Sequence, residues 1–135
     1  MFEAYTLHHV GIICPDLADA EAFMAKMGLA ESYRGHVARW GCWCLFTVAA
    51  SGAVIELVVP DDGSVLAKFN KGAGGVHHFA YQVDDLRATM DWCATRGLRM
   101  LEPEPVKGAG DFLCNFVNPV DTRGIQIEFV QPLAS

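Results

Sequence analysis

Hydrophobic and polar residues alternate with a period of two along several short segments of this chain. The alternation is clear at residues 8–13 and 77–83, and it is typical of β-strands whose two faces meet different surroundings. Turn-forming residues bound four more segments of the same kind. Further strands are therefore expected at residues 40–49, 54–59, 112–117 and 125–130.

Two helices are predicted between these strands. Asp16 and Asp85 each stand where an aspartate side chain can accept hydrogen bonds from the first turn of a helix. Gly28 and Gly97 follow, and glycine commonly ends a helix because it adopts the left-handed conformation without strain. The sequence predicts helices at residues 17–27 and 85–96.

The two halves of the chain repeat each other. They match without a gap for about twenty residues when His9 is aligned with His78. The last strands of the halves then match after a short shift, which aligns Glu56 with Glu128 and places a proline four residues after each glutamate. Such self-similarity indicates that one structural unit occurs twice.

Each half reads strand, helix and then further strands, so the sequence predicts an α+β fold of two tandem βαβββ modules. We place the modules at residues 5–60 and 74–132, within a single domain that spans residues 1–135. Between them, residues 64–69 are expected to form a short helix and residues 71–75 a flexible, glycine-rich connector. The connector lacks the Gly-Lys-Ser/Thr ending of a phosphate-binding loop.

Strand alternation separates two histidines and two glutamates from their bulky neighbours. His9 is expected on the face opposite Val10 and Ile12, and His78 and Glu128 are set apart from their apolar neighbours in the same way. Each imidazole then shares its face with a small residue, which leaves room for a ligand. The adjacent His8 and His77 point the other way and are interpreted as structural, or as residues that support the ligands without binding the ion.

These four residues are candidate metal ligands. Taken singly, a strand histidine is usually structural and a strand glutamate usually solvated, but recurrence at matching positions favours a shared function. A carboxylate inside a hydrophobic strand needs a compensating cation. Imidazole and carboxylate ligands suit Zn²⁺, Co²⁺, Ni²⁺, Mn²⁺ or Fe²⁺, and the absence of thiolates from the set argues against a closed structural zinc site. A fold that kept the repeat and lost the metal is the alternative. The set is His9, Glu56, His78 and Glu128.

Composition narrows the classes of partner. The 135 residues are 52% hydrophobic and 19% charged, with a net charge of −6 and no cluster of lysine and arginine. This balance favours a globular protein with a small-molecule ligand over one that binds nucleic acid or an anionic membrane. No apolar run approaches the roughly 20 residues that span a bilayer, and no export signal is evident, so a cytoplasmic location is expected. The five cysteines lack a paired Cys-x-x-Cys frame and are expected to be reduced core or pocket residues.

Four segments carry a family resemblance: residues 7–12, 64–69, 74–78 and 124–128. Over almost its whole length the chain resembles the vicinal oxygen chelate superfamily (glyoxalase, bleomycin resistance protein, dioxygenase). The sequences of these four segments are similar to those of methylmalonyl-CoA epimerases. The resemblance implies a glyoxalase-like, cup-shaped mixed sheet around one metal ion, often completed by a homodimer.

The resemblance also implies a function for the candidate ligands. His9, Glu56, His78 and Glu128 would hold one divalent ion that chelates a carboxylic acid or acyl-thioester substrate, and the enzyme would epimerise it by α-proton abstraction. For proton transfer we favour Glu128, with Glu56 as the corresponding residue of the first half. His36 is a further candidate base.

Two departures from the epimerase pattern keep alternatives open. The epimerases use a further glutamate as a base, but no Asp or Glu occurs between Glu31 and Glu56. Residues 118–121, Asn-Pro-Val-Asp, also replace the family's His-Pro-Lys motif. The alternatives are a glyoxalase I-type lactoylglutathione lyase and a non-catalytic small-molecule binding or resistance protein. An extradiol dioxygenase is disfavoured because a fourth ligand at Glu56 would fill a position that its reaction needs open.

Overall fold

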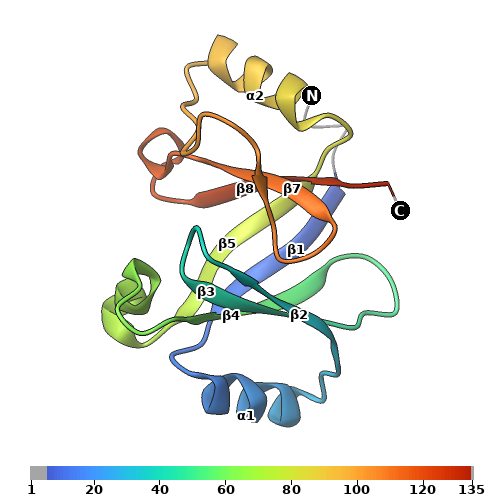
Figure 1. Cartoon of the computed structure of the whole chain (residues 1–135), viewed down its shortest axis with the longest axis vertical. Helices are drawn as coiled ribbons and strands as arrows, with labels where there is room; N and C mark the ends of the chain where they lie inside the picture. The colour runs from blue at the N-terminus through green and yellow to red at the C-terminus, as the bar shows by residue number, and fades with distance from the viewer. Residues whose placement is uncertain (1–5, 135) are drawn as a thin grey trace. The chain divides into compact units, whose positions relative to one another are not determined.

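The computed structural model of the chain describes residues 6–134 (Figure 1). By its internal contacts the chain divides into two compact units. One consists of residues 9–77, and the other of residues 78–134 together with residues 6–8. A strand followed by a helix and then three strands occurs twice along the chain, as the sequence predicts.

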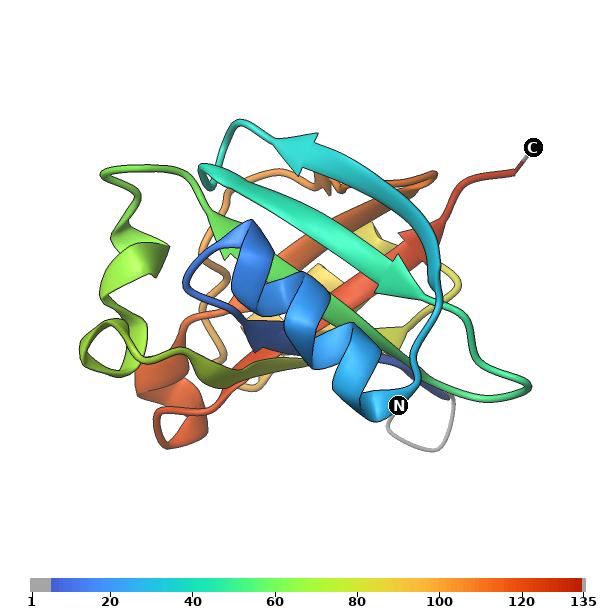
Figure 2. The ribbon, with the colours of Figure 1, turned by 90° about the horizontal axis from the view of Figure 1, so that it is seen from below.

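The first unit holds a four-stranded sheet in the order β2-β3-β4-β1. Strand β1 pairs in parallel with β4, whereas β2, β3 and β4 form antiparallel pairs. Figure 2 shows that helix α1 lies across one face of these strands. The elements are β1 (Thr6–Ile13), α1 (Leu17–Met27), β2 (Glu31–Val37), β3 (Cys42–Thr47) and β4 (Val54–Pro60).

Both ends of α1 are fixed by the predicted residues. Asp16 accepts a hydrogen bond of 2.8 Å from the backbone N–H of Asp19, and Gly28 ends the helix at φ 68°. The helix buries Ala20 and Met24 against a cluster that includes Leu45 of β3 and Leu57 and Val59 of β4. Because strand residues alternate between faces, this packing turns the intervening residues of β3 and β4 away from the helix.

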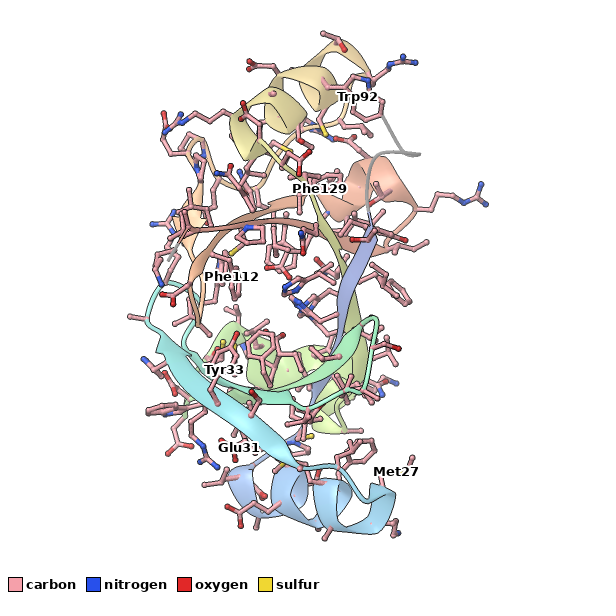
Figure 3. The ribbon with its side chains drawn as sticks, turned by 90° about the vertical axis from the view of Figure 1, so that its right-hand side faces the viewer. Met27, Glu31, Tyr33, Trp92, Phe112 and Phe129 are labelled. Carbon is pink, nitrogen blue, oxygen red and sulfur yellow. The ribbon has the colours of Figure 1, made fainter. Side chains whose placement is uncertain are left out.

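The second unit repeats the plan with strands in the order β5-β8-β7-β6. Strand β5 pairs in parallel with β8, and the other pairs are antiparallel. Figure 3 shows Phe129 on the α2 side of this sheet, in the cluster that Trp92 of α2 also joins. The elements are β5 (Gly75–Gln82), α2 (Leu86–Thr95), β6 (Val106–Lys107), β7 (Phe112–Val117) and β8 (Gln126–Pro132).

Helix α2 begins as expected. Asp85 accepts a hydrogen bond of 3.1 Å from the N–H of Ala88, and Gly97 has φ 73° just after the helix. Leu86 and Cys93 of α2 are fully buried. The predicted helix at residues 85–96 is confirmed to within one residue at either end.

The structure adds strands that the alternation does not reveal. β2 is polar and largely exposed along the edge of its sheet, and β6 has two residues. The segment expected at residues 64–69 is a 3₁₀ helix, η2 (Val65–Gly72), whose first turn is capped by the side chain of Ser64. Among residues 6–134, no helix is long and apolar enough to cross a membrane.

The connector between the predicted modules is more constrained than its glycine content suggests. Gly74 is buried at φ 74°, and a Cβ added there would overlap the backbone carbonyl oxygen of Ile13. Gly52 has a similar φ of 76°, but a Cβ there would meet no atom within 4 Å. A side chain at Gly74 is therefore disfavoured both by backbone conformation and by a steric clash, whereas one at Gly52 is disfavoured by backbone conformation alone.

Gly74→Ala is expected to destabilise the protein by about 1–3 kcal/mol more than Gly52→Ala. Both substitutions place an alanine at a positive φ, which costs free energy. Only Gly74→Ala also forces the backbone to move around Ile13. Urea unfolding of the two variants and the wild type measures the difference. Equal free energies of unfolding for the two variants would contradict it.

Candidate functional site

In the first unit, His9 of β1 and Glu56 of β4 form a buried pair. Their exposed fractions are 0% and 5%, and His9 Nε2 lies 3.7 Å from Glu56 Oε1. Glu56 stands opposite Gly11 in the β1–β4 ladder and opposite Phe46 in the β3–β4 ladder. The ring of Phe46 meets that of His9 edge-on, with 5.3 Å between centroids. A glycine and an aromatic ring therefore frame the carboxylate.

The second unit contains the same arrangement. His78 of β5 and Glu128 of β8 are both 4% exposed, and His78 Nε2 lies 3.3 Å from Glu128 Oε1. Glu128 stands opposite Ala80 in the β5–β8 ladder and opposite Phe116 in the β7–β8 ladder. Phe116 meets His78 edge-on at 5.4 Å between centroids. The repeat thus includes side-chain geometry as well as secondary structure.

Each pair lies on the strand face turned away from its helix. Leu57 packs in the cluster beneath α1, and Phe129 in the cluster beneath α2. Glu56 and Glu128 are their immediate neighbours in sequence, so they point to the opposite faces. The packing of each helix therefore determines the direction of each carboxylate.

The donor chemistry of the pairs fits a divalent metal ion. His9, His78 and Glu128 are buried residues of types that bind such ions. The two N···O distances, 3.7 and 3.3 Å, exceed an ordinary hydrogen bond. Two donors each about 2.1 Å from one ion stand roughly 3.0–3.5 Å apart, for right-angled to tetrahedral geometry. The separation of His78 and Glu128 falls within this range, whereas that of His9 and Glu56 is slightly longer.

Sequence analysis did not identify the two phenylalanines. The available signal was a repeated Cys-x-Phe: Cys44 and Phe46 on β3 correspond to Cys114 and Phe116 on β7. The strands were predicted, but the phenylalanines look like ordinary core residues until the ladder places them beside the glutamates. Tyr33 was missed too. It stands opposite Phe46 in the β2–β3 ladder and stacks on it at 4.8 Å, with 40% of its surface exposed.

Known proteins resemble the chain over nearly its full length. A model of the Glyoxalase/Bleomycin resistance protein/Dioxygenase superfamily matches residues 8–116. An ethylmalonyl-CoA/methylmalonyl-CoA epimerase of Cereibacter sphaeroides is 34% identical over 134 residues, covering 93% of this chain and 96% of that protein. The chain belongs to the glyoxalase/bleomycin resistance/dioxygenase superfamily.

Solved structures of this superfamily confirm the fold class. Methylmalonyl-CoA epimerase from Mycobacterium tuberculosis superposes with a TM-score of 0.88 at 31% identity, covering 96% of this chain and 89% of that one. A methylmalonyl-CoA epimerase in complex with methylmalonyl-CoA and NH4+ superposes with a TM-score of 0.85 at 26% identity, covering 97% and 96%. The predicted resemblance to the epimerases is confirmed. These relatives support an epimerase and favour neither a lyase nor a non-catalytic binding protein.

The structure does not bring His36 to the face of Glu56. His36 stands opposite Trp43 in the β2–β3 ladder, and Trp43 stands opposite Val59, whose side chain packs beneath α1. Its Nε2 lies 2.7 Å from Oδ2 of Asp61. The side chain of His36 therefore lies on the face of the sheet opposite Glu56. Its role as a base stays a prediction.

The segment that departs from the epimerase motif has a structural role here. Asn118 caps η3 (Pro119–Thr122) by accepting a hydrogen bond from the N–H of Val120. Arg99 donates side-chain hydrogen bonds of 3.0 and 2.9 Å to Asp121, and these bonds hold the pKa of the Asp121 carboxyl below its usual range. The segment is thereby tied to the residues that follow α2.

Proposed function

We propose that this member of the superfamily is a metal-dependent epimerase. It would invert the carbon between the carboxylate and the thioester carbonyl of a 2-carboxyacyl-CoA such as methylmalonyl-CoA. The observation that carries the proposal is the repeated buried histidine–glutamate pair, with its edge-on phenylalanine, in both halves of the chain. The similarity to methylmalonyl-CoA epimerases supports both the reaction and the substrate class.

We further propose that one divalent ion is held by all four residues, His9, Glu56, His78 and Glu128. Two neutral imidazoles and two carboxylates together carry two negative charges, which balance the two positive charges of a divalent ion. Burial supports this assignment, because two carboxylates that are 5% and 4% exposed need positive charge nearby. Co²⁺, Zn²⁺, Ni²⁺, Mn²⁺ and Fe²⁺ all accept this set.

The two glutamates carry proton transfer in this proposal. When bound, a divalent ion polarises the substrate carbonyl and stabilises negative charge on its oxygen, which makes the α-proton acidic. The carboxylate of Glu128 accepts the α-proton from one side of the carbon. Glu56, protonated and not coordinated at that stage, donates a proton from the other side, so the centre is inverted. The low exposure of both groups limits the access of bulk water to them.

The surrounding residues position these groups. Phe46 and Phe116 hold the imidazole rings by edge-on contact, which restricts rotation of His9 and His78. Gly11 and Ala80 leave space beside the carboxylates because their side chains are small. A small-molecule acyl thioester is the partner that follows from this proposal.

The homodimer and the cytoplasmic location expected from the sequence stay predictions, as do the module boundaries.

Deuterium exchange tests the function. Incubated with methylmalonyl-CoA in deuterated water, the protein is expected to incorporate deuterium at the α-carbon and to interconvert the epimers, far above the rate without protein. Treatment with a chelator should stop both reactions, and adding Co²⁺ should restore them. Methylglyoxal with glutathione serves as the control substrate and should give no product. Metal-loaded protein that exchanges no deuterium into any 2-carboxyacyl-CoA would falsify the proposal.

A further inference from the structure

Strand β3 places two thiols side by side on the face that carries Phe46. Cys42 and Cys44 are separated by one residue, so strand alternation points both side chains the same way. Their sulfur atoms lie 3.9 Å apart, and both residues are buried and free of disulfides. The metal-binding residues proposed above do not include them.

We propose that Cys42 and Cys44 form a second binding site, a dithiol that chelates a soft, thiophilic metal ion. The sulfur separation is the first argument. Two thiolates bound at about 2.3 Å to a tetrahedral ion stand roughly 3.8 Å apart, so the pair needs almost no rearrangement to take one. A disulfide, by contrast, requires the sulfurs to approach from 3.9 Å to about 2.0 Å along a single strand.

The neighbouring residues supply the second argument. On this face, Cys44 stands between Gly35 of β2 and Val58 of β4, and Cys42 stands between Val37 and Pro60. All four neighbours are apolar, and Gly35 has no side chain to cover the sulfur of Cys44. Two thiolates and a divalent ion form a neutral group, and apolar surroundings accommodate a neutral group better than separate charges.

The binding step balances in protons and charge. Each thiol releases its proton to water as its sulfur forms a bond to the ion, so two protons leave for each ion bound. Soft d¹⁰ ions such as Cd²⁺ prefer sulfur ligands, whereas the imidazole and carboxylate pairs suit harder ions. The chain thus carries two chemically distinct sites, and this one does not depend on the proposed epimerase activity.

The second half of the chain provides a matched control. Cys114 of β7 stands opposite Val130, as Cys44 stands opposite Val58. The position that corresponds to Cys42 holds Phe112, so only one thiol occupies that face of β7. A single thiolate cannot chelate, and Cys114 should bind a soft ion far more weakly than the Cys42–Cys44 pair.

Titration of the reduced full-length protein with Cd²⁺ tests the site. The ultraviolet absorption band of cadmium–thiolate bonds should saturate with one ion bound through two sulfurs. Histidine and glutamate ligands do not give this band, so binding at the proposed catalytic site does not interfere. Cys42→Ser and Cys44→Ser should each weaken the response on the order of a hundredfold or more, because the second bond of a chelate forms intramolecularly. Cys114→Ser should leave it unchanged.

Alkylation of the wild-type protein gives a second readout that needs no variant. All three cysteines are buried, so a maleimide reagent labels them slowly, as the structure opens locally. Cd²⁺ should slow the labelling of Cys42 and Cys44 far more than that of Cys114, as peptide mass spectrometry over a time course shows. The absence of a thiolate band in the wild type overturns the inference. So does an undiminished band in both serine variants, or equal protection of all three cysteines.

Discussion

Replacing Glu128 by glutamine is expected to lower turnover by on the order of a thousandfold while the protein remains folded. Glutamine keeps the size of the side chain and one oxygen donor, but it cannot accept the α-proton. Glu128 is 4% exposed and lies 3.3 Å from His78, so water has little access to take over the proton transfer. Turnover of methylmalonyl-CoA and deuterium incorporation, measured on the metal-loaded variant, determine the size of the loss.

Glu104→Gln is the matched control for this experiment. Glu104 belongs to the same unit, pairs with Arg87 at 2.6 Å and has a side chain that is 66% exposed, so its substitution should leave turnover unchanged. Near-wild-type turnover in Glu128→Gln with metal bound would contradict the assignment of Glu128 as a base.

Glu56→Gln then distinguishes one base from two. If the glutamates serve opposite sides of the carbon, each single variant stops inversion but still exchanges deuterium into one epimer, and the two variants retain exchange into different epimers. If Glu128 alone transfers protons, Glu56→Gln keeps inversion. The pattern of labelled epimers therefore reports the role of each carboxylate separately.

The paired histidines and glutamates could be predicted because their signal is local. Alternation within a strand determines the face on which His9 or Glu56 lies, and the repeat supplies an independent copy of each at His78 and Glu128. The helices were equally accessible, since Asp16 supplies its cap within three residues of its partner. Interactions that depend on neighbours in sequence are thus visible in the sequence.

The contacts that sequence analysis missed depend on pairing between strands. β2 has no apolar alternation because it lies at the edge of its sheet and is largely exposed. Its pairing with β3 also shifts between Glu31 and Tyr33, and this irregularity determines which residues face Phe46. With this pairing, His36 stands opposite Trp43 of β3, on the face of the sheet that does not carry Phe46. No pattern within β2 itself specifies that outcome.

His78→Ala is expected to abolish high-affinity metal binding and, with it, the stabilisation that the metal provides. An ion present at about a hundred times its dissociation constant stabilises the native state by about 2.7 kcal/mol, and a loss of affinity of about a hundredfold on removing one of the four proposed ligands leaves about 0.4 kcal/mol of this. The wild type should therefore melt at a higher temperature with Co²⁺ than with a chelator. The His78→Ala variant should melt at nearly the same temperature in both.

The neighbouring histidine provides the control for this prediction. His77 points to the other face of β5 and meets the ring of Phe69 edge-on at 5.1 Å, so His77→Ala should keep the metal-dependent rise in melting temperature even if it lowers both values. His9→Ala should behave like His78→Ala, because the proposed site takes one imidazole from each half. An undiminished response to Co²⁺ in either of these two variants would show that its histidine is not a ligand, and the shared site would have to be abandoned.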